Sequence, residues 1–344
     1  MRLFLHKLTH WEYWPFQVVY IPIYFQWLYY AWRARSLFFF NAVNPSIKNG
    51  GFFNESKKEI YDLIPQQYYP KTNWVEAFIP FQNVQDLVEQ TSLPFPFIVK
   101  PDVGLRGSAV KRIHNWEELK IYHENANFNY LIQDLIPYAN EVGIFYVRFP
   151  DEVKGTVTGI VAKEFMIVTG DGSSSLEMLI KKDPRFELQL EVLRKELNEK
   201  IHEVLPQGEQ INLVPYGNHC RGTKFVDVSH KISPKLIETI DAMCQQIDGF
   251  YYGRMDIMYQ TWEELEQGKN FAIVELNGSA SEPTHIYDPK HSIFFAWKEI
   301  ARHIRYLFKI SQQNHKKGIP YLNYKEGVAE YKKHQEHSEL ITQV

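Results

Sequence analysis

Two short stretches near the C-terminal end of the chain, GRMDIMY at residues 253–259 and FAIVELNG at residues 271–278, decide the fold. Apolar and polar residues alternate in both stretches, which predicts two neighbouring antiparallel strands joined by a loop. Glu275 and Asn277 are two residues apart on one strand, so their side chains point to the same face. Asp256 reaches that face from the other strand. The two strands therefore bring three oxygen-bearing side chains together.

These three side chains predict a magnesium site, because Mg²⁺ is usually held by one or two carboxylates together with substrate phosphates. Arg254 precedes Asp256 by two residues and shares its face, where its charge suits a transferred phosphoryl group. For any single acidic residue in a strand, a solvated outer face is the ordinary alternative. The apolar residues on either side of Asp256 and Glu275 disfavour that alternative here.

A second group of residues predicts phosphate binding. Lys100 ends the apolar strand predicted at 97–99, and a glycine-bearing loop follows it at residues 102–108. An ammonium group and the backbone amides of a glycine loop both bind phosphate oxygens, and Arg106 adds a fork-shaped donor. The loop lies between two strands, whereas a Walker or dinucleotide-binding loop joins a strand to a helix. By itself such a hairpin is usually only a turn.

A third group lies at the end of the strand predicted at 130–133. A backbone edge at Gln133 and Asp134, directly after an apolar strand, suits pairing with an adenine ring. Glu141, a few residues further on, suits the hydroxyl groups of a ribose. Taken alone, this signal barely exceeds background.

In order and spacing, the three groups resemble the ATP-grasp superfamily, and most closely its D-alanine–D-alanine ligase and cyanophycin-synthetase-like branches. The resemblance covers about residues 94–289. The matching stretches are FPFIVKPDVGLRGSAVKRI, NYLIQDLIPYANEVGIFYV, GDGSSSLEMLIKKDPR, GNHCRGTKF, GRMDIMY and FAIVELNGSASEPT. The resemblance implies an α+β fold of the ATP-grasp type, in which two α+β subdomains grip ATP.

The resemblance also implies roles for individual residues. The residues implied to bind ATP are Lys100, Gly104, Arg106, Gly107, Ser108, Gln133, Asp134, Leu135, Ile136, Glu141 and Lys163. Arg254 and Lys100 are implied to act in catalysis. The residues implied to bind Mg²⁺ are Asp256, Glu275 and Asn277. The residues implied to contact the substrates are Asn218, Arg221, Ser281 and His285.

The reaction implied by the resemblance is ligation. ATP, with Mg²⁺, would phosphorylate a small carboxylate, and a small amine would attack the acylphosphate. Two alternatives stay open: a catalytically weak, membrane-associated ATP-binding module, and an ATP-grasp kinase or carboxylase. The run GSASEP at residues 278–283 departs from the ligase branch where its members read their substrates. The acceptor, whether an amine, a thiol or a hydroxyl, is therefore not specified.

The composition disfavours other classes of protein. The chain of 344 residues carries 38 Lys and Arg against 41 Asp and Glu, which is a poor balance for a nucleic-acid-binding protein. The two cysteines, Cys220 and Cys244, cannot build a disulfide framework and have no metal-ligand spacing. An intracellular, cytoplasmic setting is therefore expected. The sequence lacks a nucleophile elbow and a dinucleotide fingerprint, which disfavours a hydrolase or a dehydrogenase.

Residues 13–32 (YWPFQVVYIPIYFQWLYYAW) contain no charged side chain, and Arg33 and Arg35 follow them directly. The length is borderline for a membrane span, and the prolines, glutamines and tyrosines are unsuited to one. Trp and Tyr prefer the headgroup level of a bilayer, and arginines favour anionic lipid. We therefore expect peripheral contact with the inner face of a membrane through residues 11–35. Packing on the protein's own core, or a homodimer interface, is an equal alternative.

The sequence divides into an aromatic segment at 1–40, a short region at 41–93, an ATP-grasp domain at 94–311 and a polar tail at 312–344. Helices are predicted at 55–63, 116–125, 175–181, 186–204, 234–248 and 293–308. Strands are predicted at 97–99, 109–113, 130–133, 143–149, 155–168, 250–257 and 271–276.

Overall fold

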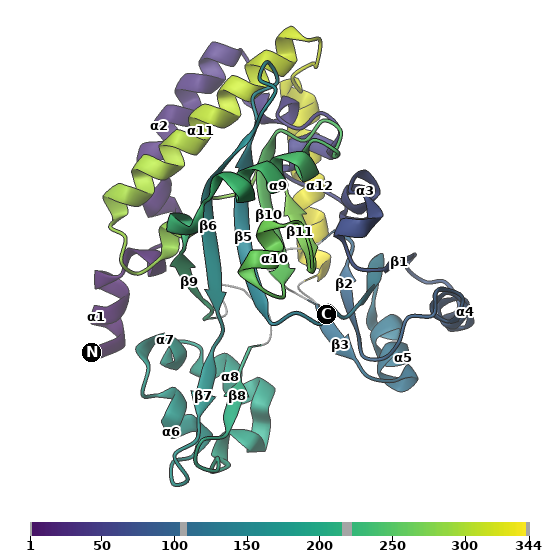
Figure 1. The fold of residues 1–344 in the computed structure, drawn as a ribbon, viewed down its shortest axis with the longest axis vertical. Helices are drawn as coiled ribbons and strands as arrows, with labels where there is room; N and C mark the ends of the chain where they lie inside the picture. The colour runs from purple at the N-terminus through teal and green to yellow at the C-terminus, as the bar shows by residue number, and fades with distance from the viewer. Residues whose placement is uncertain (1, 104–108, 215–221, 342–344) are drawn as a thin grey trace.

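The computed structural model describes residues 2–103, 109–214 and 222–341 (Figure 1). Helices pack on three sheets, which have four, five and two strands. Neighbouring strands in all three sheets are antiparallel. This mixture of helix and sheet confirms the α+β class that the sequence predicts.

The four-stranded sheet forms one lobe, at the right of Figure 1. Its strands, in spatial order, are β1 (Thr72–Val75), β4 (Tyr130–Asp134), β2 (Phe97–Pro101) and β3 (Lys111–Ile113). Two helices cover it, α4 (Phe81–Thr91) and α5 (Trp116–Asn125). Val84 and Leu119 of these helices share a buried core with Val99. Neither β1 nor α4 is among the predicted elements, and β1 occupies the outer edge of β4.

The five-stranded sheet lies at the centre of the molecule. Its strands, in spatial order, are β11 (Phe271–Asn277), β10 (Tyr252–Tyr259), β5 (Asn140–Val147), β6 (Thr156–Glu164) and β9 (Lys224–Asp227). Three helices border the core on one face, α3 (Lys57–Leu63), α9 (Pro234–Cys244) and α10 (Trp262–Glu266). Cys244 is fully buried there, as predicted for a packed residue. The opposite face carries the candidate site.

A small third lobe lies below the central sheet in Figure 1. Its elements are β7 (Ile167–Thr169), α6 (Leu176–Ile180), α7 (Pro184–Glu187), α8 (Leu190–Leu197) and β8 (Gln210–Asn212). Two predictions are wrong in this region. The strand predicted at 155–168 is divided between β6 and β7, which belong to different sheets. The helix predicted at 186–204 is broken, because Asn198 adopts a positive φ of 46°, which a helix cannot continue through, and ends α8.

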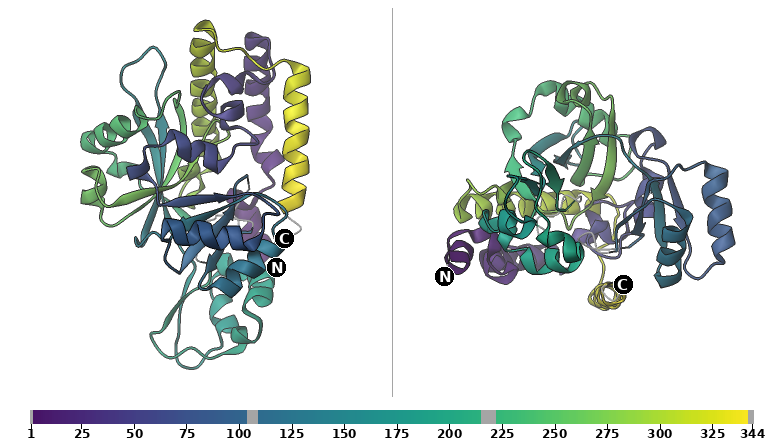
Figure 2. Two further views of the ribbon diagram at one scale, coloured as in Figure 1. Left: turned by 90° about the vertical axis from the view of Figure 1, so that its right-hand side faces the viewer. Right: turned by 90° about the horizontal axis from the view of Figure 1, so that it is seen from below.

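The N-terminal and C-terminal helices group on one side of the five-stranded sheet (Figure 2). They are α1 (Arg2–Thr9), α2 (Phe16–Ala34), α11 (Ile293–Lys316) and α12 (Tyr324–Ile341). Two side chains tie α2 to α11: Trp297 Nε1 donates to the Val19 carbonyl at 2.8 Å, and Gln26 Nε2 donates to the Ala301 carbonyl at 2.9 Å. Across the described ranges, no helix is both long enough and apolar enough to cross a membrane.

Helix α11 continues to Lys316, beyond the end predicted at residue 308. Ile310 is fully buried, and Asn314 Nδ2 donates to the Ala42 carbonyl at 2.8 Å and to the Val43 carbonyl at 3.1 Å. These contacts hold the last turns of the helix against the segment that follows α2. Together with α12, this makes most of the chain from residue 312 to residue 341 helical.

Candidate active site

The predicted pairing of β10 with β11 is confirmed. In their register Asp256 lies opposite Glu275, and Arg254 lies opposite Asn277. On the other side of β10, strand β5 places Gly143 opposite Asp256. A Cβ atom on Gly143 would lie 3.1 Å from Asp256 Oδ1, so the glycine leaves room for the carboxylate.

Four charged side chains from three adjacent strands meet on this face. Lys163 of β6 donates to Asp256 Oδ2 at 3.1 Å and also forms an ion pair with Glu141 of β5. Arg254 donates through Nε to Asp256 Oδ1 at 2.9 Å and through Nη2 to Oδ2 at 3.3 Å. The structure therefore brings together a predicted metal ligand, the predicted catalytic arginine and two residues that the resemblance implies for ATP.

The surroundings favour the charged forms of three of these groups. Burial alone would raise the pKa of Asp256, but Arg254 and Lys163 outweigh it and hold that pKa below its ordinary value. Burial also opposes the charge of Lys163, yet Asp256 and Glu141 raise the pKa of this lysine. Glu141 differs, because burial raises its pKa even beside Lys163. The two cations of this cluster are thus held in their charged forms by the carboxylates beside them.

Lys100 links the two larger sheets. It lies in β2 and is only 6 % exposed. Its ammonium group donates to Gln133 Oε1 at 2.8 Å, to the Tyr61 hydroxyl at 3.0 Å and to the Val274 carbonyl of β11 at 3.2 Å. Burial lowers the pKa of Lys100 to about 8, although the Glu275 carboxylate acts in the opposite direction. This amine is therefore charged near neutral pH and is directed at the strand that bears Glu275 and Asn277.

In the structure, only part of the segment predicted to pair with adenine lies outside the sheet. Strand β1 pairs with one edge of β4 and β2 with the other, up to Asp134. The backbone of Gln133 is therefore engaged, and its side-chain amide donates to Thr72 Oγ1 at 2.8 Å. Leu135 and Ile136 follow β4 outside any strand and are half-buried. Of the four residues implied for the hinge, these two keep a backbone that lies outside the sheet.

The structure adds Glu55 and Lys57, which the sequence motifs miss. Gly51 packs on Gly278 directly after β11, and a Cβ atom on Gly51 would come within 2.6 Å of Gly278 Cα. This close contact of backbone with backbone requires two glycines. It brings the segment before α3 to the end of β11, where Lys57 Nζ lies 3.9 Å from Glu275 Oε1.

Glu55 has an unusual environment beside these residues. Its Oε2 atom is buried and has no hydrogen-bond partner within the described ranges. Burial raises the pKa of Glu55 to about 8, while Lys57 opposes the shift and Glu275 adds to it. The carboxyl group is therefore largely protonated at neutral pH, and in that form it can donate a hydrogen bond.

We expect Glu55 to make the protein less stable as the pH rises from about 5 to about 8, because the folded chain binds this proton more tightly than the unfolded chain does. The contribution to the free energy of unfolding should fall by a few kcal/mol, on the order of 1.4 kcal/mol per unit of pKa shift. Glu55→Gln should lack this fall, as measured by urea unfolding at both pH values. Glu59→Gln, exposed on α3, is the matched control. An unchanged pH dependence in Glu55→Gln would contradict the burial of the carboxyl.

Asp256, Glu275 and Asn277 fit a hard cation by the chemistry of their oxygen atoms. The Glu275 side chain is 38 % exposed, and the amide nitrogen of Asn277 is buried without a hydrogen-bond partner in the part of the chain that the structure describes. In the part of the chain that the structure describes, no group of three or more His, Cys, Asp or Glu side chains is placed to hold a metal ion. Mg²⁺ takes few protein ligands and completes its shell with phosphates and water. Two carboxylates and one amide therefore suffice.

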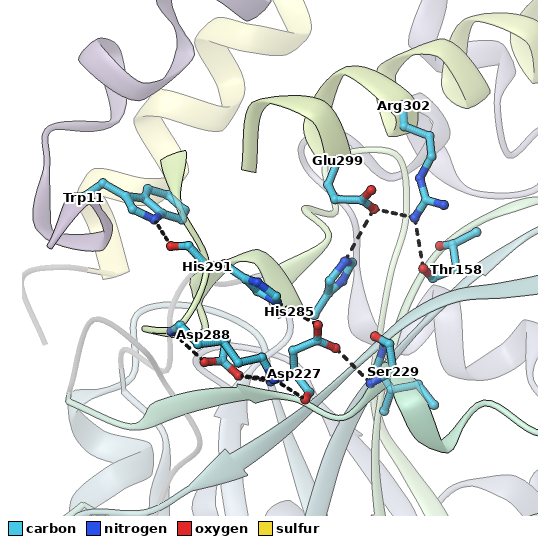
Figure 3. A network of polar contacts seen from close by, with 11 residues as sticks. Trp11, Thr158, Asp227, Ser229, His285, Asp288, His291, Glu299 and Arg302 are labelled. Atoms are coloured by element: carbon cyan, nitrogen blue, oxygen red, sulfur yellow. Dashed lines mark hydrogen bonds and ion pairs between the residues drawn. The ribbon is translucent and has the colours of Figure 1, made fainter. Parts of the chain in front are cut away.

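Ser281 and His285, which the resemblance implies for the substrate, have structural partners. Ser281 Oγ donates to the Asn277 carbonyl at 2.7 Å and accepts from the Arg254 amide at 3.3 Å, so it shapes the turn after β11. His285 is 4 % exposed, and its imidazole lies 3.5 Å from Glu299 Oε2 of α11 (Figure 3). Neither side chain is free to approach a substrate in this arrangement.

His285 belongs to a polar network that fixes α11 to the sheet (Figure 3). Glu299 forms an ion pair with Arg302, which donates to the Thr158 carbonyl at 3.0 Å. Nearby, His291 Nε2 lies 2.7 Å from Asp227 Oδ2. These contacts account for His285 as a residue that positions helices.

Several implied site residues lie outside the described residues. They are Gly104, Arg106, Gly107 and Ser108 of the glycine loop, together with Asn218 and Arg221. Their implied roles stay predictions.

Comparisons with known proteins give structural neighbours only. No family model matches the chain, and no curated protein matches it. A bifunctional glutathione synthetase from Pasteurella multocida is similar at 13 % identity and a TM-score of 0.40, over 73 % of this chain and 35 % of that one. The VanG D-Ala:D-Ser ligase from Enterococcus faecalis is similar at 14 % identity and a TM-score of 0.42, over 74 % of this chain and 61 % of that one.

A D-alanine–D-alanine ligase from Bacillus anthracis is similar at 14 % identity and a TM-score of 0.43, over 76 % of this chain and 69 % of that one. The chain thus spans about a third of the glutathione synthetase and less than two thirds of the D-Ala:D-Ser ligase. By name, the three neighbours are a glutathione synthetase and two ligases.

Proposed function

We propose that this protein is an ATP-grasp ligase that uses ATP and Mg²⁺ to activate a carboxylate for attack by an amine. One observation supports the proposal above the others. The Arg254–Asp256 pair of β10 lies opposite Glu275 and Asn277 of β11, while Lys100 contacts β11 from the other sheet. Glu275 lies within electrostatic range of both Lys100 and Arg254. This is a site built for a polyanion with its counter-cation.

In this reaction the side chains position the substrates and neutralise their charges. A carboxylate oxygen of the substrate attacks the γ-phosphorus of ATP, and the bond to the bridging oxygen breaks to release ADP. The amine then attacks the acyl carbon, loses a proton, and phosphate leaves. In this proposal Lys100 and Lys163 bind phosphate oxygens, and Arg254 stabilises the charge on the transferred group. Mg²⁺, when bound by Asp256, Glu275 and Asn277, supplies further charge neutralisation.

The reaction needs no side-chain nucleophile. This agrees with Cys244, which is fully buried and whose pKa burial raises well above the ordinary value. The substrate carboxylate itself is the nucleophile of the first step.

The proposal predicts ADP and phosphate release that depends on two added substrates. The purified chain is incubated with ATP, Mg²⁺ and pools of small carboxylic acids and amino acids, and both products are measured. Pools that contain a carboxylate and an amine should release ADP and phosphate in equal amounts. The amino-acid pool supplies both groups by itself, whereas the pool of small carboxylic acids alone should release little. ADP release at the same rate without any added carboxylate would contradict carboxylate activation.

A further inference from the structure

Helix α2 has an exposed side that is almost entirely apolar. Its buried side packs on α11 and the core, through Val19, Ile23, Tyr30 and Ala31. The exposed large apolar side chains on its other side are Phe16, Val18, Ile21, Tyr24, Phe25, Leu28, Tyr29 and Trp32. Phe25 and Trp32 are 72 % and 75 % exposed. An ordinary surface helix carries polar residues on such a side.

The same surface extends beyond both ends of α2. Helix α1 lies along the same edge of the molecule in Figure 1 and exposes Phe4, Leu5 and Leu8. At the other end of α2, Trp32 and Tyr324 line an open hollow of about 470 Å³ beside Arg35. We call the exposed apolar side chains of α1 and α2 the α1–α2 face. Exposed apolar surfaces of this extent mark interaction sites.

The charged side chains of residues 2–35 are mostly basic, although Arg2 forms an ion pair with Glu187. Residues 2–35 contain four Lys and Arg and a single acidic residue, Glu12, a net charge of +3. The whole chain has a net charge of −3, so the other residues carry the balance of −6. Glu12 is neutralised by Arg185 of the small lobe, 2.6 Å away. Arg33 and Arg35 are exposed at the end of α2.

We propose that the α1–α2 face docks on an anionic lipid bilayer, with α2 lying in the plane of the interface. Tyr and Trp side chains favour the headgroup level, and exposed basic residues beside them attract anionic lipid. A second copy of the chain is a poorer occupant, because two such faces would bring the same positive charges together. The 19 residues of α2 form a helix roughly 28 Å long, which gives a line of contact rather than a point.

The docked helix would also lie beside the candidate site. Tyr20, on the packed side of α2, donates a hydrogen bond to Glu282, and the Tyr287 hydroxyl donates to the same carboxylate at 3.1 Å. Glu282 lies within electrostatic range of Arg254. Glu282 therefore lies between α2 and the candidate site. The docking proposal itself does not depend on the proposed function.

Flotation with lipid vesicles tests the proposal. The full chain is mixed with vesicles of phosphatidylcholine, either pure or with about 30 % phosphatidylglycerol, and is spun through a density gradient. We expect the protein to float with the anionic vesicles and to float several-fold less with the neutral ones. Raising the salt concentration should reduce flotation, because it screens the basic residues.

One variant on the α1–α2 face and one control elsewhere test which surface contacts the vesicle. Phe25→Glu should reduce flotation by roughly tenfold or more, since it puts a charge in the centre of the α1–α2 face. Ile121→Glu, at an equally helical and 53 % exposed position on α5, is the matched control and should float like the wild type. Equal flotation of Phe25→Glu and the wild type would overturn the proposal. Wild-type protein that stays unbound but forms Phe25-dependent dimers in sedimentation would also overturn it, in favour of a second copy.

Discussion

Glu275→Gln is expected to lower substrate-dependent ADP release by roughly 100-fold, which is the usual effect of removing one charge that stabilises a reacting group. The substitution keeps the shape of the side chain and removes its negative charge at the end of β11. Initial rates of ADP release at saturating ATP and Mg²⁺ measure the effect. The fold should tolerate the change, because the Glu275 side chain is 38 % exposed and its ion pair with Lys57 is long at 3.9 Å.

Two controls separate this effect from damage to the fold. Glu263→Gln removes an exposed carboxylate on α10 and should leave ADP release unchanged. The free energy of unfolding of Glu275→Gln, measured by thermal unfolding, should lie within about 1 kcal/mol of the wild-type value. Asp256→Asn is a less clean test, because it would leave Arg254 and Lys163 buried without their shared carboxylate, at a cost of ~3–5 kcal/mol. Full activity in Glu275→Gln would show that this residue is not part of the active site.

Lys100→Met is expected to weaken ATP binding by roughly 30-fold. A hydrogen bond to a charged group contributes about 2 kcal/mol, and 1.4 kcal/mol corresponds to about a factor of ten. Methionine keeps most of the length of the side chain and removes the ammonium group that joins β2 to β11. Isothermal titration calorimetry with a non-hydrolysable ATP analogue measures the change. Lys111→Met, exposed on the adjacent strand β3, is the matched control and should bind like the wild type.

The affinity of the wild type should also depend on pH through Lys100. Burial lowers the pKa of Lys100 to about 8, so the free protein loses this charge as the pH rises above that value. Bound phosphate favours the charged form, so binding then requires uptake of a proton, and affinity should fall by up to roughly tenfold per pH unit above about 8. Lys100→Met should lack this fall. A wild-type affinity that is constant up to pH 9.5 would contradict the role of the buried amine.

The local pattern of the sequence was sufficient to predict β10, β11 and the facing of Asp256 and Glu275. Alternation on neighbouring strands indicates which side chains share a face, and in the structure Asp256 lies opposite Glu275. The ion pairs of Lys163 with Asp256 and Glu141 depend on the order β10, β5, β6. That order brings together residues 93 and 22 positions apart, and no local pattern specifies it.

The contribution of Glu55 could not be predicted from its neighbours in the sequence. It depends on Gly51 meeting Gly278, a contact between segments more than two hundred residues apart. The Asn-Gly-Gly turn at 49–51 was the available signal, because glycines that adopt positive φ often mark a close approach of two backbones. The strand at 72–75 has only four residues, too few for alternation to be distinctive, and its presence is what closes the backbone edge at Gln133.

The α1–α2 face shows what composition can and cannot predict. An uncharged aromatic stretch indicates burial. It does not indicate whether the stretch packs on the protein's own core, on a second copy of the chain or on a membrane. The structure divides the stretch into two sides, one packed on α11 and one exposed. The packed side confirms that part of this segment contacts the protein's own core, and lipid contact through the exposed side stays a proposal.

Transfer of oxygen from the carboxylate to phosphate is the most direct test of the central claim. The active substrate pool is prepared with ¹⁸O in its carboxyl groups, and the phosphate released with ADP is analysed by mass spectrometry. Carboxylate activation predicts one ¹⁸O atom in each phosphate, because the acyl carbon–oxygen bond breaks when the amine attacks. Phosphate that takes its oxygen from water instead would show simple hydrolysis of ATP and would contradict the account.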